Sequence, residues 1–168
     1  MMTDTPTDLR AGYTADADLR AALLALNNAH AVELSLADEA RMAMLVERAF
    51  VAARLGNLDA ALIAFDQDAD YDSANFQWFR ARYPRFVYVD RIVTAPHARG
   101  RGLARRLYTH LFEQARLAGH DCVVCEVNSD PPNPVSEMFH RALGFEPVGE
   151  ALLENGKTVT YLSRTLGQ

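Results

Sequence analysis

The feature that most constrains this chain is a regular stretch between residues 86 and 127 that alternates between strand and helix patterns. Phe86–Thr94 and Cys122–Val127 are rich in β-branched and aromatic residues, which favours strands. Between them, Gly102–Ala118 predicts a helix that Gly119 ends. Two strands joined through a helix in about forty residues form a right-handed βαβ unit. The chain is therefore expected to be an α/β protein with a mixed sheet.

The turn that leads into this helix has the composition of an anion-binding site. It reads Ala95-Pro-His-Ala-Arg-Gly-Arg-Gly-Leu-Ala104, so two glycines precede the first helical turn. Such a turn can aim several backbone N–H groups at one point, and the helix dipole adds about half a positive charge there. We expect a bound phosphate or pyrophosphate, and a tight turn with solvated arginines is the alternative. The arginines concerned are Arg99, Arg101, Arg105 and Arg106.

The rest of the chain predicts further helices and strands around this unit. Helical spacing of apolar residues predicts helices over Asp16–Asn28 and Leu36–Leu55. An aromatic helix is expected between Ser73 and Pro84, and a last helix begins at Asn133 and Pro134 and ends at Gly144. The other expected strands lie around Leu9–Tyr13, over Leu58–Phe65, from Phe145, and through Thr158–Leu162 after the hairpin turn Asn155-Gly156.

Length and composition bound the remaining possibilities. A chain of 168 residues with 49% hydrophobic and 23% charged residues is expected to form one domain over residues 1–168. Its net charge of −5 argues against nucleic acid as a partner. The sequence has neither a long apolar run nor a signal pattern, so we expect a cytoplasmic protein without a membrane partner. Cys122 and Cys125 lie three apart on a predicted strand and point to opposite faces, so no redox or metal site is expected.

The turn and a second motif together resemble the GNAT acyltransferase superfamily. The common dinucleotide and Walker patterns are absent, whereas Arg99-Gly-Arg-Gly102-Leu-Ala104 matches the coenzyme A pyrophosphate loop, Gln/Arg-x-x-Gly-x-Gly/Ala. The preceding segment Ile92–Pro96 looks like the bulged strand of that family. Farther along, Asn133–Phe145 is similar to its signature Asn-x-x-Ala-x-x-Phe-Tyr-x-x-x-Gly-Phe. The resemblance covers Phe86–Phe145, and the remaining elements fit the family's order loosely.

This resemblance implies a GNAT-like mixed, mostly antiparallel sheet of about six or seven strands flanked by helices, with one parallel βαβ unit that holds the coenzyme cleft. The two parallel strands would splay, the pantetheine arm of acetyl-CoA would lie between them, and no metal is implied. Asn133 would bind the pantetheine or support the acceptor side, besides capping its helix. The coenzyme-binding residues so implied are Ile92, Val93, Thr94, Arg99, Gly100, Arg101, Gly102, Leu103, Ala104, Arg105 and Asn133.

The implied reaction is direct attack of an amine on the acetyl-CoA thioester, and it needs a base, a polarised carbonyl and a proton for the thiolate. A backbone N–H near Val93 is expected to polarise the carbonyl. Asp90 and Glu126 are both candidates for the base, because each is a carboxylate on a cleft strand; an ion pair for Asp90 or a structural hydrogen bond for Glu126 is the alternative. The position that usually holds the family's tyrosine is His140, which is either the acid, favoured by a raised pKa, or part of the channel lining.

The acceptor is expected to be an amine of a small molecule or a peptide, and the protein a monomer or a homodimer. The resemblance places the acceptor pocket near the first helices and the loop before the central strand, where Asn28, Trp78 and Tyr88 are the candidates. Aromatic residues there serve a core equally well. A non-catalytic acyl-CoA-binding module of the same fold is the alternative function, because His140 stands where the family carries a phenol.

Overall fold

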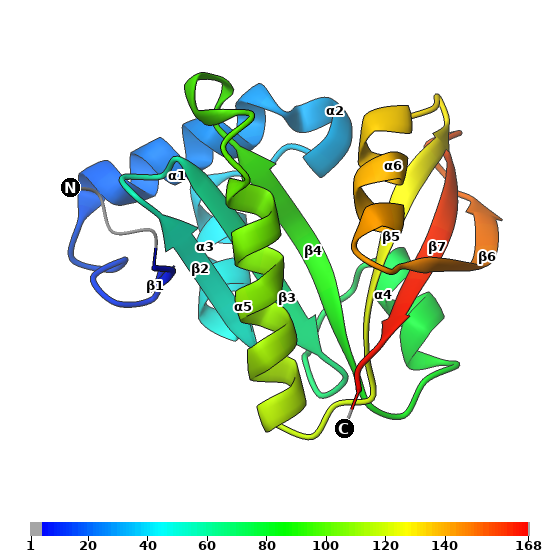
Figure 1. Ribbon diagram of the computed structural model, residues 1–168. Coiled ribbons are helices and arrows are strands. Elements are labelled where there is room, and N and C mark those ends of the chain that lie inside the picture. The colour runs from blue at the N-terminus through cyan, green and yellow to red at the C-terminus, as the bar shows by residue number, and fades with distance from the viewer. Residues whose placement is uncertain (1–4, 168) are drawn as a thin grey trace.

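The chain folds around one seven-stranded sheet with strand order β1-β2-β3-β4-β5-β7-β6 (Figure 1). The computed structural model describes residues 5–167, without the side chains of residues 32 and 33. The strands are β1 (Thr7–Asp8), β2 (Val51–Leu55), β3 (Ala60–Asp66), β4 (Phe86–Thr94), β5 (Cys122–Asp130), β6 (Glu146–Leu152) and β7 (Thr158–Thr165). The helices are α1 (Ala17–Ala29), α2 (Ala31–Leu34), α3 (Glu39–Arg48), α4 (Ala74–Arg80), α5 (Leu103–Leu117) and α6 (Pro134–Ala142), with a 3-10 turn at Pro96–Ala98.

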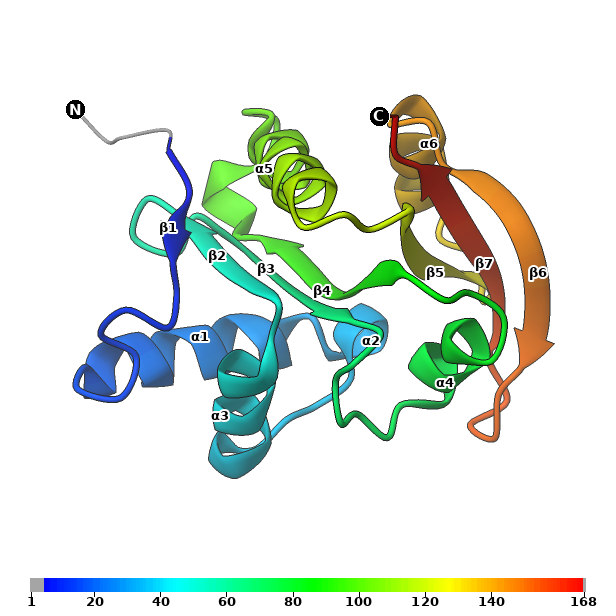
Figure 2. The same cartoon turned by 90° about the horizontal axis from the view of Figure 1, so that it is seen from below.

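Helices cover both faces of the sheet. Figure 2 shows α5 and α6 on one face, and α1, α2, α3 and α4 on the other. The strands alternate between these two layers: Phe86 and Tyr88 pack in the core under α1, α3 and α4, whereas Val87 and Val89 pack under α5. Cys122 and Cys125 are both free and buried in opposite layers, which confirms that they point to opposite faces.

Within the part of the chain that the structure describes, β4 and β5 are parallel and the other neighbouring strands pair antiparallel. This confirms the expected mixed sheet with one parallel unit. The parallel pairing joins Phe86–Tyr88 to Cys122–Val124 and, within residues 5–167, goes no farther. β4 continues to Thr94 and β5 to Asp130, and the two strands diverge toward the top of Figure 1. The facing edges of both strands are therefore open to a ligand.

A β-bulge in β4 lies at Asp90. Ile63 of β3 pairs with Arg91, and the next residue, Ala64, pairs with Val89, so Asp90 has no partner on β3. An extra residue of this kind bends the strand and re-aims a side chain. The bulge was expected within Ile92–Pro96, and the structure places it just before that segment, where it turns a candidate catalytic carboxylate.

Two predicted elements were wrong. The second helix does not run from Leu36 to Leu55: α3 ends at Arg48, Ala49 is extended, and Val51–Leu55 is strand β2. A short, almost fully buried apolar run reads the same in a helix and in a central strand, so periodicity did not separate the two. The first strand is not at Leu9–Tyr13 but at Thr7–Asp8, because the chain turns through Gly12 in the left-handed region (φ 82°).

The helix caps predicted at Ser73 and Asn133 are confirmed: their side chains accept hydrogen bonds from backbone N–H groups at the starts of α4 and α6. Asp16 caps α1 in the same way. The cap on α6 fixes Asn133 next to the diverging ends of β4 and β5. Among the residues that the structure describes, no helix is long and apolar enough to cross a membrane.

Candidate active site

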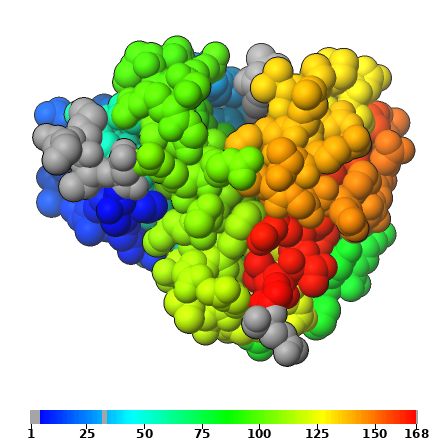
Figure 3. All heavy atoms as spheres, in the orientation of Figure 1, coloured from blue at the N-terminus to red at the C-terminus, as the bar shows by residue number. Residues whose placement is uncertain are grey.

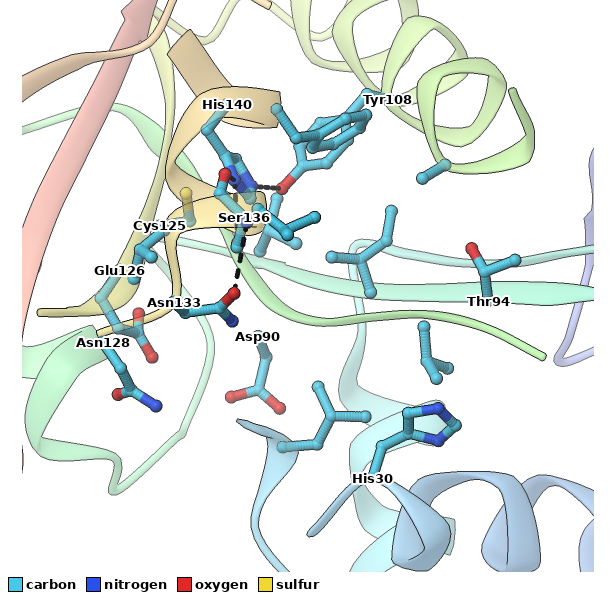
Figure 4. Close-up of a pocket in the computed structure, with 18 of the residues that line it drawn as sticks. His30, Asp90, Thr94, Tyr108, Cys125, Glu126, Asn128, Asn133, Ser136 and His140 are labelled. Atoms are coloured by element: carbon cyan, nitrogen blue, oxygen red, sulfur yellow. Dashed lines mark hydrogen bonds between the residues drawn. The ribbon is translucent and has the colours of Figure 1, made fainter. Parts of the chain in front are cut away.

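A cavity of about 640 Å³ fills the space where β4 and β5 part. Figure 3 shows the hollow at the top of the molecule, between the green segment before α5 and the yellow and orange α6. One wall is β4 with the turn before α5, and the other is β5 with α6. The end of α1, α2, α4 and the turn between β6 and β7 close the remaining sides. The cavity thus has a loop end, at the start of α5, and a carboxylate end, between Asp90 and Glu126 (Figure 4).

The loop end presents backbone rather than side chains. Gly100 and Gly102 have φ of 80° and 73°, a region that side-chain-bearing residues avoid, and a Cβ added at either would meet open space. Gly102 caps α5, and Gly102 through Arg105 line the cavity. The unpaired N–H groups of the first turn of α5, which contains no acidic residue, therefore face a ligand. This geometry fits a pyrophosphate.

The arginines of the predicted cluster divide into different roles. Arg99 and Arg105 line the cavity, and Arg99 Nη2 donates to His30 Nε2 at 3.0 Å. Arg101 turns away and pairs with Asp59 on the β2–β3 turn at 3.5 Å. The structure therefore brings two of the three arginines proposed for the coenzyme to the cavity and uses Arg101 to tether the loop.

The open edge of β4 lines the middle of the cavity. Ile92, Val93 and Thr94 pair with β3 on one side and have no strand on the other within the described residues. Backbone groups on such an edge need a hydrogen-bonding partner, and an amide-containing ligand arm supplies one. Asn133 lies across from them at the start of α6 and accepts from Ser136 N at 3.3 Å. Each of these predicted residues lines the cavity.

Glu126 is the central group of the carboxylate end. Its Oε1 accepts from the Tyr88 hydroxyl at 2.9 Å and from Asn75 Nδ2 at 3.0 Å, and Asn75 in turn accepts from Tyr161 at 2.9 Å. Its Oε2 is buried and has no hydrogen-bond partner among the described residues. Burial raises the pKa of Glu126 to about 8, against the opposing hydrogen bonds from Tyr88 and Asn75. Glu126 is thus a buried carboxyl group that is held at one oxygen and has no hydrogen-bond partner at the other among the described residues.

Asp90 projects toward the same end of the cavity from β4, but both of its oxygens are engaged (Figure 4). The Tyr71 hydroxyl donates to Oδ1 at 2.5 Å, and Arg91 Nε donates to Oδ2 at 2.9 Å. Arg91 also donates to Asn27 Oδ1 and to the backbone oxygen of Leu34. Burial raises the pKa of Asp90, and the hydrogen bonds and charge of its partners oppose the rise. The ion pair predicted as an alternative for Asp90 is present.

His140 is 4% exposed and lines the cavity from α6. Its Nδ1 lies 2.7 Å from the backbone oxygen of Ser136, and its Nε2 lies 2.7 Å from the hydroxyl of Tyr108 (Figure 4). Burial lowers the pKa of His140, which is opposite to the raised pKa that would favour an acid role. The ring is therefore a neutral member of a hydrogen-bonded pair.

The three predicted acceptor residues lie outside the cavity. Asn28 is occupied by the backbone of Ala37, Trp78 stacks on Tyr161 at 4.1 Å, and Tyr88 is 1% exposed beneath Glu126. The first two hold loops and core together, and Tyr88 donates a hydrogen bond to Glu126. The residues that do line this end, and that the sequence did not single out, are Leu34, Ser35, Asn75, Tyr108, Asn128, Leu153, Asn155 and Lys157. No motif or spacing marked them as site residues, because they come from separate elements, and Asn155 was marked only as part of a hairpin turn.

Comparisons with known proteins agree with this geometry. Residues 38–145 match the model of the Acetyltransferase (GNAT) family. The fold is similar to Ard1 from Thermoplasma volcanium (11% identity, TM-score 0.70, 98% of each chain) and to a ribosomal-protein alanine N-acetyltransferase from Escherichia coli (16%, 0.66, 98% of this chain and 94% of that one). It is also similar to YncA from Salmonella typhimurium, solved with its cofactor acetyl-CoA (20%, 0.66, 98% and 94%). A comparison with curated proteins finds no match.

Proposed function

This chain belongs to the GNAT acetyltransferase family, and we propose that it transfers an acetyl group from acetyl-CoA to the amine of a small molecule or a peptide. One observation carries the proposal: a single cavity joins a helix N-terminus suited to a pyrophosphate with a buried carboxyl group whose Oε2 has no hydrogen-bond partner among the described residues. The similar structure from E. coli is an alanine N-acetyltransferase, an enzyme that transfers the acetyl group to an amine, and this supports an amine acceptor here.

Acetyl-CoA would lie along the length of the cavity. The N–H groups of Gly102 through Arg105, with the Arg99 side chain, would hold its pyrophosphate. The open edge of β4 at Ile92–Thr94 and the Asn133 side chain would hold the pantetheine arm. This co-substrate supplies the activated thioester, and the chain supplies its position.

Glu126 would accept the proton that the amine loses. The amine nitrogen forms its bond to the acetyl carbon, the C–S bond breaks with its electron pair on sulfur, and one amine proton passes to Glu126 Oε2, directly or through water. Asp90 is a weaker candidate because Tyr71 and Arg91 engage both of its oxygens. With a pKa of about 8, Glu126 is a stronger base than an ordinary carboxylate, and its proton-accepting form becomes populated as the pH rises toward that value.

A screen of amines that follows thiol release from acetyl-CoA tests this function. Transfer to any amine in the panel, absent or greatly reduced in the Glu126→Gln variant, is expected. Thermal stabilisation by CoA without transfer to any amine of the panel would favour the binding module instead. The panel should include small amines and peptides with free N-termini, because the comparisons leave the acceptor class open.

A further inference from the structure

We propose that Tyr108, on α5, is the catalytic residue that donates its hydroxyl proton to the departing sulfur, and that His140 is the residue that positions it. The inference deepens the proposed function and rests on it. Tyr108 lines the cavity and was not a candidate from the sequence, where no motif marks it.

The hydrogen bonds of His140 assign the donor in this pair. The Ser136 backbone oxygen only accepts, so the hydrogen of the neutral ring must sit on Nδ1. Nε2 is then the bare nitrogen, and the Tyr108 hydroxyl donates to it at 2.7 Å. His140 consequently has no proton to offer toward the cavity, whereas Tyr108 has one.

The side chain of Tyr108 is fully buried, and most of its surroundings are apolar. Its ring packs against Phe112, Phe139 and Phe145, with ring centroids 5.6, 5.9 and 5.7 Å away. The polar groups that the structure describes within reach of the phenol are His140 and the Cys125 thiol, and the pKa of that thiol is itself raised by burial. Burial also raises the pKa of Tyr108, so the phenol stays protonated across the working range of pH.

This arrangement accounts for the histidine at the position where the resembled signature has tyrosine. A phenol is still present at the cavity, but it comes from α5 and meets α6 through His140 (Figure 4). As the C–S bond breaks, the hydroxyl turns from Nε2 to the sulfur; the O–H bond breaks, an S–H bond forms, and the phenolate recovers a proton from water. One proton leaves the amine and one reaches the sulfur, so the reaction balances.

The test compares the parent with Tyr108→Phe and uses Tyr83→Phe as the matched control. Both variants lose one phenolic oxygen, but Tyr83 lies after α4 and outside the cavity. Tyr108→Phe is expected to lower kcat by roughly 10²–10⁴, the range for loss of a proton donor, while the affinity for acetyl-CoA stays nearly unchanged. Tyr83→Phe is expected to keep both values.

A second readout does not depend on turnover. The thiol of bound CoA is titrated by its thiolate absorbance: a hydrogen bond from Tyr108 favours the thiolate, so the bound thiol should have a lower pKa in the parent than in Tyr108→Phe. The double variant Tyr108→Leu with His140→Tyr moves the phenol to α6 and should recover part of the lost kcat.

Equal kcat and equal thiol pKa in the parent and in Tyr108→Phe would overturn the inference and leave the proposed function standing. A parent that neither binds CoA nor acetylates any amine would overturn both. If the double variant does not fold, the thiol titration of Tyr108→Phe still decides the matter.

Discussion

The two ends of the cavity are built on opposite principles. At the loop end, Gly100, Gly102 and the start of α5 offer backbone N–H groups from one continuous segment. At the carboxylate end, Glu126 is held by side chains from three other elements: Asn75 of α4, Tyr88 of β4 and, through Asn75, Tyr161 of β7. Backbone N–H groups are sufficient to bind an anion, whereas a group that accepts a proton is a side chain whose pKa the fold can shift.

The largest effect is expected at the carboxylate end. Glu126→Gln removes the proton acceptor and keeps the hydrogen bonds at Oε1, so kcat/KM should fall by roughly 10²–10⁴ with coenzyme affinity nearly intact. Steady-state kinetics and calorimetric titration with CoA measure the two quantities. Glu146→Gln makes the same chemical change on exposed β6 and should have no effect. Equal losses of activity and of CoA affinity would mean that Glu126 only maintains the cavity.

Substitution of Asp90 is expected to differ from substitution of Glu126 because it lowers the stability of the fold. Asp90→Asn leaves the buried Arg91 without its ionic partner, so the free energy of unfolding should drop by about 3–5 kcal/mol in denaturant titrations. Asp72→Asn is the matched control, because Asp72 pairs with Arg41 at 83% exposure and such a pair contributes at most about 1 kcal/mol. A stable Asp90→Asn protein that has lost catalysis would make Asp90 the base instead.

The loop end is tested by Gly102→Glu. The substitution places a negative side chain in the space that faces the pyrophosphate, and the affinity for CoA should fall at least about tenfold as the thermal shift with CoA disappears. Gly12→Glu controls for backbone strain, because Gly12 has a similar φ of 82°, also meets open space, and lies outside the cavity. The loop assignment fails if both variants keep the shift in Tm that CoA causes in the parent.

The smallest effects should distinguish two neighbouring arginines. Arg99→Ala should weaken CoA binding by about tenfold, the value of one charge-assisted contact, whereas Arg101→Ala should change it little because Arg101 pairs with Asp59 outside the cavity. Calorimetric titrations at one ionic strength compare the two. The reverse order of affinities would show that the loop rearranges when it binds CoA.

The sequence predicted the two ends unequally. The loop residues lie together in the chain, and glycine, arginine and a helix start agree in one short segment, so the loop end was predicted almost residue by residue. Arg101 is the exception, since only the tertiary fold shows the Asp59 that draws it away. The mostly antiparallel sheet with one parallel pair was predicted as well. Strand β2 was predicted as part of a helix, because a short apolar run looks the same in a buried strand and in a buried helix.

The carboxylate end was predicted only in its acidic residues. Asp90 and Glu126 were equivalent in the sequence, because nothing in it shows that Arg91 and Tyr71 saturate one carboxylate and that the other keeps an unpaired oxygen. Asn75 lies 51 residues from Glu126, and Tyr108 lies 32 residues from His140. Pairs at such separations have no periodicity, so packing alone brings them together.

The most direct test of the account is the pH dependence of acetyl transfer in the parent and in Glu126→Gln, measured with an acceptor amine that is already neutral at about pH 6. Burial raises the pKa of Glu126 to about 8, so the carboxylate that accepts the proton forms only as the pH rises through that value. The account predicts that kcat/KM of the parent rises to a plateau with a midpoint near pH 8 and that the variant lacks this rise. The same pH profile in both proteins would contradict it.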